Sequence, residues 1–193
     1  MTAPQPTSRP SVRHLPNLIC LIRIALIWPI TAALRDGAMT SALALFAAAA
    51  VSDGLDGYLA KRFNWTSELG KILDPLADKL LLVTVFVEST WLGLIPWWLT
   101  AAVVARDVMI GLGALVYRLW FGPLRGRPTM LSKINTALQL LYVMLVMLDA
   151  AAGMPPRELL GAAAALTLAT TVVSGLHYVA TFTRRVWTQA RPA

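Results

Sequence analysis

Charged side chains are scarce in this sequence of 193 residues, of which 14% are charged and 57% are hydrophobic. An average soluble domain has about 25% charged residues, so the composition excludes an ordinary soluble fold and indicates a membrane protein. A single cysteine, Cys20, excludes an internal disulfide. The sequence shows no internal repeat, and its length suits one domain of several membrane-spanning helices.

The formal net charge is +7 and the isoelectric point is about 10.2. A basic chain can bind nucleic acid, but a membrane protein also gathers lysine and arginine in its cytoplasmic loops. The second explanation fits the composition better, and we expect no nucleic-acid partner.

Six segments are apolar and long enough to cross a membrane as helices, which takes about 20 residues. They cover residues 16–34, 39–62, 72–90, 94–120, 133–151 and 157–183. Six spans put both termini on one side of the membrane, and thirteen of the 17 lysine and arginine residues fall on that side. The opposite side has only Arg35 and Arg157, so the positive-inside rule predicts that both termini are cytoplasmic.

We expect residues 1–14 to form a flexible cytoplasmic arm, residues 15–185 the membrane domain, and residues 186–193 a basic cytoplasmic tail. No clear small-residue cleavage site follows the first apolar run, which favours a retained helix over a signal peptide. The arm has no evident transit peptide, so a bacterial plasma membrane is the expected location.

Four aspartates fall in one short window of this chain, which has ten acidic residues in all: Asp53, Asp56, Asp74 and Asp78. On helices the first two, at i and i+3, share a face, and so do the last two, at i and i+4. A short loop around residues 64–67 would bring the pairs together at the cytoplasmic end of the second and third spans. Four neighbouring carboxylates cannot all stay ionised without cations, and two Mg²⁺ or Mn²⁺ ions would balance them.

A plainer alternative is that the acids are solvated and form surface ion pairs with basic neighbours, namely Lys61, Arg62, Lys71 and Lys79. Acids at a membrane edge are functional by default, and their orderly spacing here favours a site. Pro75 predicts that a helix starts or kinks just after Asp74.

The window has the pattern Asp53-x2-Asp56-Gly57-x2-Ala60-Lys61-x8-Gly70-x3-Asp74-x3-Asp78. It resembles the signature of the CDP-alcohol phosphatidyltransferases, integral membrane enzymes of phospholipid synthesis, at seven of its eight fixed positions. The departure is Lys61, where the family has arginine; lysine keeps the charge but loses the planar fork that binds phosphate bidentately. The stretch "PTMLSKINTALQ" resembles the cardiolipin synthase branch of the family.

The resemblance implies an all-α integral membrane fold of six transmembrane helices with a cytoplasm-facing polar cavity, usually as a homodimer. It implies that the four aspartates hold two divalent ions, Mg²⁺ or Mn²⁺, and that Asp78 is also the general base. It implies further that the CDP moiety is bound by Asp56, Gly57, Ala60, Lys61 and Gly70.

The implied reaction transfers a phosphatidyl group from CDP-diacylglycerol to the hydroxyl of phosphatidylglycerol, giving cardiolipin and CMP by metal-assisted in-line attack. Arg106 and Lys133 are candidates to bind the phosphate of this anionic acceptor. Two structural explanations stay open: Arg106 or Arg23 pairs with an acid such as Asp107, and Lys133 anchors the helix at the interface. Asn135 and Gln139 are expected to form hydrogen bonds between helices.

Three other functions are alternatives to this one. A phosphatidylglycerophosphate synthase would use the same donor and metals but take glycerol 3-phosphate as acceptor. A membrane prenyltransferase also binds diphosphate through aspartates, but the glycine framework of the window fits it poorly. A small cation transporter is the alternative of another class, and the position of the acids at the membrane edge argues against it, because transporter sites lie near the bilayer midplane.

Overall fold

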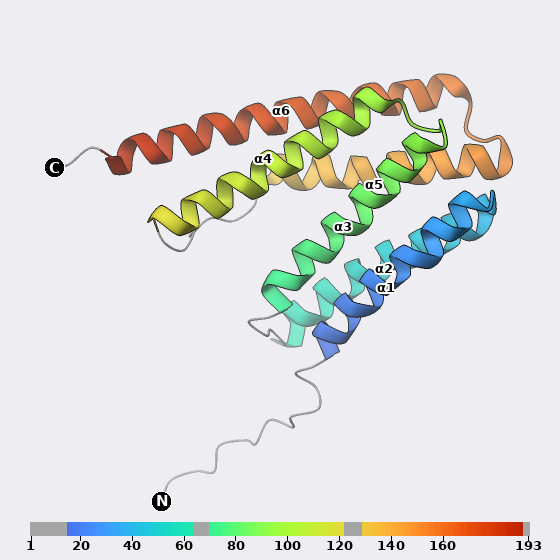
Figure 1. Ribbon diagram of the computed structural model, residues 1–193, viewed down its shortest axis with the longest axis horizontal. Coiled ribbons are helices and arrows are strands. Elements are labelled where there is room, and N and C mark those ends of the chain that lie inside the picture. The colour runs from blue at the N-terminus through green and yellow to red at the C-terminus, as the bar shows by residue number, and fades with distance from the viewer. Residues whose placement is uncertain (1–14, 64–69, 122–128, 191–193) are drawn as a thin grey trace, which may run out of the picture.

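The computed structural model describes the backbone of residues 15–63, 70–121 and 129–190, and the side chains of residues 20–54, 75–120 and 129–184. In these ranges every regular element is an α-helix (Figure 1). The helices are α1 Leu15–Arg35, α2 Met39–Phe63, α3 Gly70–Trp91, α4 Trp97–Phe121, α5 Met130–Ala152 and α6 Arg157–Ala190. They confirm that each of the six predicted segments is helical, although α6 continues beyond the expected end at residue 183.

Apolar helices of membrane-spanning length account for much of the described chain. By length and composition, three stretches qualify: Trp97–Trp120, Met130–Ala152 and Arg157–Arg184. A shorter apolar stretch, Met39–Gly54, lies in α2. These helices indicate a membrane protein, as the composition predicts.

The three short connections lie together at one end of the bundle (Figure 1). Each contains a glycine with a left-handed backbone, at φ 73° for Gly37, 74° for Gly93 and 67° for Gly153. Glycine has no Cβ and adopts this conformation without strain, so it can end a helix in a tight turn. Gly153 closes α5 by donating its backbone N–H to the carbonyl of Asp149 at 2.7 Å.

The hydrophobic core fills the half of the bundle next to these connections. It joins buried side chains of α1, α2, α3, α4 and α5, the largest being Ile30, Leu34, Phe46, Phe86, Leu99 and Met147. At the same end the guanidinium of Arg35 binds the carboxylate of Glu88, with Nε 2.9 Å from Oε2, and ties α1 to α3. Toward the opposite end α4 and α6 diverge from α1, α2 and α3 (Figure 1). The aspartate window lies at this diverging end.

Polar side chains join α5 to α6 inside the bundle. Asn135 Oδ1 accepts hydrogen bonds from the hydroxyls of Thr170 and Thr171, both at 2.9 Å. Gln139 Nε2 donates to Thr171 Oγ1 at 3.3 Å. The predicted role of Asn135 and Gln139 in bonding helices together is therefore confirmed.

A glycine permits the close approach of α4 and α6. A Cβ on Gly113 would lie 2.6 Å from Tyr178 Oη, so any other residue at this position would require the Tyr178 side chain to move. Tyr178 Oη instead donates to the backbone carbonyl of Ile110 at 3.1 Å. This packing fixes α6 beside α4 at the diverging end of the bundle.

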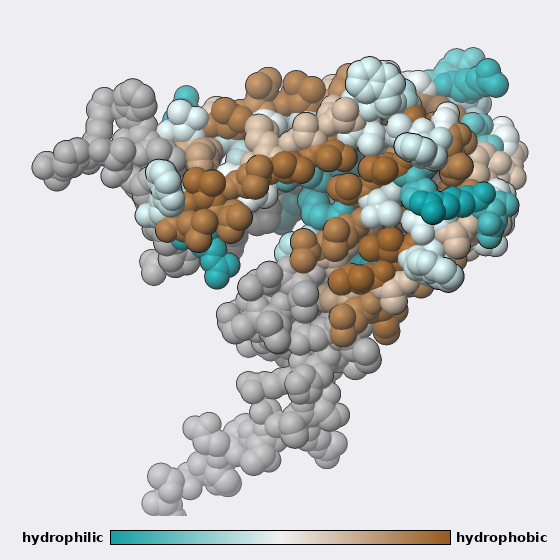
Figure 2. Space-filling model, in the orientation of Figure 1, coloured by the Kyte–Doolittle hydropathy of each residue, from teal (hydrophilic) through white to brown (hydrophobic). Residues whose placement is uncertain are grey.

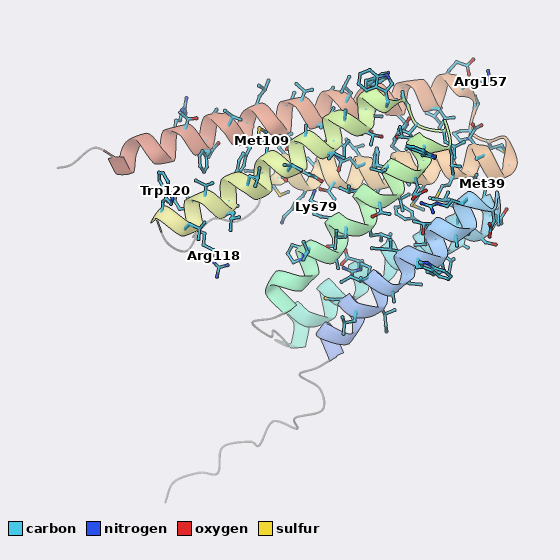
Figure 3. All side chains as sticks on the ribbon, in the orientation of Figure 1. Met39, Lys79, Met109, Arg118, Trp120 and Arg157 are labelled. Atoms are coloured by element: carbon cyan, nitrogen blue, oxygen red, sulfur yellow. The ribbon has the colours of Figure 1, made fainter. Side chains whose placement is uncertain are left out.

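Described basic residues lie at both ends of the bundle. Figure 3 shows Arg118 toward the diverging end and Arg157 beside the short connections. The outward surface of α4 is largely hydrophobic (Figure 2), and the indoles of Trp97 and Trp120 at its two ends are exposed. An exposed indole suits the membrane interface, because one part of the ring is apolar and the other can hydrogen-bond.

Candidate active site

The four aspartates lie on two helices that both pack against α1. Asp53 and Asp56 are in α2, and Asp74 and Asp78 are in α3. The helical backbone at these positions confirms the predicted spacing, so each pair lies on one face of its helix. The side chains of Asp53 and Asp78 are among those that the structure describes.

One guanidinium joins the described pair. Arg23 of α1 places Nη2 2.7 Å from Asp53 Oδ1 and donates from Nη1 to Asp78 Oδ1. The Arg23 side chain is 3% exposed, whereas those of Asp53 and Asp78 are 38% and 37% exposed. Carboxylates from two helices thus converge on one buried positive charge while keeping an accessible side.

The other residues predicted to bind metal or nucleotide lie outside the described side chains. They are Asp56, Gly57, Ala60 and Lys61 in α2, with Gly70 and Asp74 in α3. Their roles in binding metal and nucleotide stay predictions, as does the path of the loop at residues 64–69.

Of the two possibilities expected at Pro75, a helix start is wrong, and a kink stays a prediction. α3 begins at Gly70 and includes Pro75. Proline lacks the N–H that would bond to the carbonyl four residues earlier, at Lys71. That carbonyl belongs to the first turn of α3, where the loss of one hydrogen bond does not prevent the helix from forming.

A second polar cluster lies between α3 and α4, where Figure 3 places Lys79. Lys79 Nζ donates to Asp107 Oδ2 at 2.6 Å, and Arg106 Nη1 donates to Asp107 Oδ1 at 2.6 Å. Arg106 Nη2 also donates to the hydroxyls of Ser132 in α5 and Ser174 in α6, both at 2.7 Å. The cluster therefore joins α3, α4, α5 and α6, with Asp107 shared between two cations.

This cluster has more positive than negative charge and lies mostly out of water. The side chains of Arg106 and Asp107 are 4% and 7% exposed, and that of Lys79 is 38% exposed. Within the described part of the chain, the buried Nε of Arg106 has no hydrogen-bond partner. A buried guanidinium with an unused donor and a surplus positive charge suits an anionic ligand.

The ion pairs test two structural explanations offered by the sequence. The predicted alternative in which Arg106 pairs with Asp107 is confirmed, and Arg23 also has acidic partners. Lys79 pairs with Asp107, whereas Asp53 and Asp78 both contact Arg23; the side chains of Lys61, Arg62 and Lys71 lie outside the described part. The plain pairing of the window acids with Lys79 is therefore not what the described residues show.

Lys133 is exposed in the first turns of α5 and is not among the partners that the described residues give Arg106. Its role at an acceptor site stays a prediction. The contact between Lys79 and Asp107 was not predicted from the sequence. Adjacent Arg106 and Asp107 in an apolar helix signalled a buried ion pair, but nothing local pointed to a lysine 28 residues earlier.

Residues 13–176 match the sequence profile of the CDP-alcohol phosphatidyltransferases. The chain belongs to the CDP-alcohol phosphatidyltransferase family. The matched range includes both polar clusters and the whole aspartate window, so the predicted resemblance is confirmed.

Relatives of this family member have two different names. The human protein named cardiolipin synthase (CMP-forming) is 35% identical over 158 residues, which are 72% of this chain and 52% of that protein. The Streptomyces coelicolor protein of the same name is 38% identical over 105 residues, 51% of this chain and 49% of that protein. A Mycobacterium tuberculosis protein named "Probable phosphatidylglycerophosphate synthase" is 30% identical over 193 residues, 91% of this chain and 85% of that protein. The chain spans about half the length of the cardiolipin synthases that it matches.

Members of the family generally depend on divalent metal ions. The donor set fits such an ion, because Asp53 and Asp78 offer the carboxylate oxygens that Mg²⁺ and Mn²⁺ prefer and already converge on a cation. Among the described side chains, no group of three acidic, histidine or cysteine residues is close enough to hold a metal ion. The other two predicted metal ligands are Asp56 and Asp74, whose side chains lie outside the described part of the chain.

Proposed function

We propose that the chain transfers the phosphatidyl group of CDP-diacylglycerol to the hydroxyl of phosphatidylglycerol, forming cardiolipin and CMP. The observation that carries this proposal is the convergence of Asp53 and Asp78 on Arg23, inside the range that matches the family. Accessible carboxylates from two helices, held at one point, provide ligands for the divalent ions that accompany a diphosphate substrate.

In the proposed reaction the acceptor oxygen attacks the phosphorus that bears the diacylglycerol. The bond from this phosphorus to the bridging oxygen breaks, and its electron pair leaves with CMP. Asp78 accepts the proton of the attacking hydroxyl. Asp53, Asp56, Asp74 and Asp78 would hold the divalent ions, which when bound would neutralise the diphosphate and stabilise the leaving CMP.

We assign binding of the CDP moiety to five residues of the aspartate window. These are Asp56, Gly57, Ala60, Lys61 and Gly70. Lys61 in place of arginine supplies a point charge to a phosphate rather than a planar pair of donors.

A contact of Ser132 supports phosphatidylglycerol as the acceptor. Ser132 belongs to the segment that resembles the cardiolipin synthase branch, and its hydroxyl accepts a hydrogen bond from Arg106. The segment thus contributes a side chain to the cationic cluster, where the phosphate of an anionic acceptor would be attracted. Glycerol 3-phosphate also carries a phosphate, and the long match to the mycobacterial protein favours it as the alternative acceptor.

One assay separates these functions. Purified protein is incubated with CDP-diacylglycerol and Mn²⁺ or Mg²⁺, and CMP release is measured with each acceptor in turn. We expect release with phosphatidylglycerol and formation of cardiolipin. Release with glycerol 3-phosphate alone would establish the alternative acceptor, and metal flux into liposomes without CMP release from any acceptor would establish a transporter.

The proposal includes the setting of the enzyme. We place it in a bacterial plasma membrane, as a homodimer with both termini and a polar cavity on the cytoplasmic side. The basic residues at the diverging end of the helices support this orientation, because Arg118 lies near the C-terminal end of α4 and Lys133 near the N-terminal end of α5.

Replacing Arg106 by alanine tests the acceptor site. The change removes the cation that bonds to Asp107, Ser132 and Ser174, so we expect the KM for the acceptor to rise by about 10²-fold, with a much smaller change in the KM for CDP-diacylglycerol. The comparison variant is Lys133→Ala, which removes an exposed lysine and should raise the acceptor KM less. Equal effects of Arg106→Ala on both substrates would contradict an acceptor role.

A further inference from the structure

Arg23 binds the two carboxylates that are proposed to hold metal, and it comes from a third helix. We propose that Arg23 is a displaceable counter-cation: it neutralises Asp53 and Asp78 before metal binds, is released from at least one of them by a divalent ion, and then binds the diphosphate of the substrate. This inference rests on the proposed function, because that function supplies both the metal and the diphosphate.

The burial of Arg23 explains why it pairs with the acids before metal binds. Its side chain is 3% exposed, and a guanidinium out of water needs an anionic partner. Asp53 and Asp78 need a positive charge for the same reason, because carboxylates gathered in one place repel each other. The contacts of Arg23 to both acids satisfy the two requirements together.

A divalent ion that binds Asp53 and Asp78 would compete with Arg23 for the two carboxylates. The guanidinium contacts the acids from the buried side, whereas more than a third of each carboxylate side chain is accessible, so an incoming ion can reach them. A divalent ion bound to the same carboxylates would stand close to a buried positive charge, in a medium that screens the repulsion poorly. Either the Arg23 guanidinium or the divalent ion must therefore lose some of its contacts with the two carboxylates.

Arg23 that loses an acidic partner remains a buried cation and requires another anion. A guanidinium offers paired donors in a plane, which match phosphate oxygens. The diphosphate of a CDP-lipid bound at these aspartates is an anion of that kind. Binding of metal and binding of nucleotide should then favour each other through Arg23, and such coupling is reciprocal.

Direct binding of Mn²⁺ to purified protein, followed by electron paramagnetic resonance without any lipid substrate, tests the competition. We expect Arg23→Gln to lower the Kd for Mn²⁺ by about tenfold, since the competing charge is gone. The matched control is Arg35→Gln, which removes an arginine of the same helix that also binds a carboxylate, at the other end of the bundle. This control should bind Mn²⁺ as the wild type does.

A second measurement tests the transfer of Arg23 to the diphosphate. CDP is added as the probe, and the Mn²⁺ titration is corrected for the complex of Mn²⁺ with CDP measured without protein. In the wild type CDP should lower the Kd for protein-bound Mn²⁺ by about fivefold or more, and in Arg23→Gln most of this gain should disappear.

The outcomes separate this inference from the proposed function. If the wild type binds Mn²⁺ and Arg23→Gln binds it equally or more weakly, Arg23 does not compete with metal and the inference fails alone. If the wild type binds no Mn²⁺, the metal chemistry of the proposed function fails with it. Should Arg23→Gln not fold, Arg23→Lys decides the matter: an ammonium cannot hold both carboxylates with a planar fork, so the Kd should fall modestly, and an unchanged or higher Kd overturns the proposal.

Discussion

Replacing Asp78 by asparagine should reduce CMP release by about 10²- to 10⁴-fold, the usual contribution of a general base. Asparagine has nearly the same shape but cannot accept the proton of the acceptor hydroxyl. Binding of CDP-diacylglycerol should largely survive, because Asp53, Asp56 and Asp74 remain as metal ligands. The measurements are CMP release under saturating acceptor and equilibrium binding of the CDP-lipid in the same detergent.

Two comparisons make the Asp78 result specific. Asp36→Asn changes an exposed aspartate in the turn between α1 and α2, and it should leave CMP release unchanged. Asp78→Asn also removes one charged partner of Arg23, so the thermal unfolding of the variant must be measured with its activity. Turnover close to that of the wild type in a folded Asp78→Asn protein would remove Asp78 from the mechanism.

The helices were predictable because local sequence determines them. Each predicted segment is a long apolar run, and the connections carry glycines or prolines that stop a helix, such as Gly37, Gly93 and Gly153. Where the prediction failed, tertiary structure overrode a local signal. Pro75 was expected to mark a helix start or a kink, but α3 already begins at Gly70, and α6 extends to Ala190, past the expected end at residue 183.

The aspartate spacing could be predicted, but the partners of the acids could not. A helix places Asp53 and Asp56 on one face whatever surrounds them, so the motif is visible in the sequence. Arg23 is 55 residues from Asp78, and only the packing of α1 against both α2 and α3 brings the two together. An arginine in an apolar run signals that some acid must compensate it, and the sequence offers several candidates.

The two polar clusters share helix α3 at consecutive positions. Asp78 contacts Arg23 of α1, and Lys79 contacts Asp107 of α4. Successive residues on a helix point about 100° apart, so α3 can present an acid to the proposed donor site and a cation to the proposed acceptor site. Within the proposed function, this single helix sets the distance between the metal ligands and the acceptor phosphate. A change on one side of α3 is then expected to affect the other.

Replacing Asp107 by asparagine should destabilise the protein by about 3 kcal/mol and lower the apparent Tm by roughly 6–12 °C. The change leaves Arg106, 4% exposed, and Lys79 beside each other without the carboxylate that both contact. A buried cation whose acidic partner has been removed costs far more than the pair itself contributed. Thermal unfolding in detergent, with Asp149→Asn of α5 as the control, measures the effect.

The double variant Arg106→Gln with Asp107→Asn separates charge from packing. It removes the buried pair as a whole and leaves Lys79, which is partly exposed and can keep its charge in water. If the decrease in Tm caused by Asp107→Asn comes from uncompensated positive charge, the double variant should have a Tm much closer to that of the wild type. A double variant that is less stable than Asp107→Asn would show instead that Arg106 holds α4, α5 and α6 together through its bonds to Ser132 and Ser174. The positive charge of the cluster would then matter to the fold only through these hydroxyl contacts.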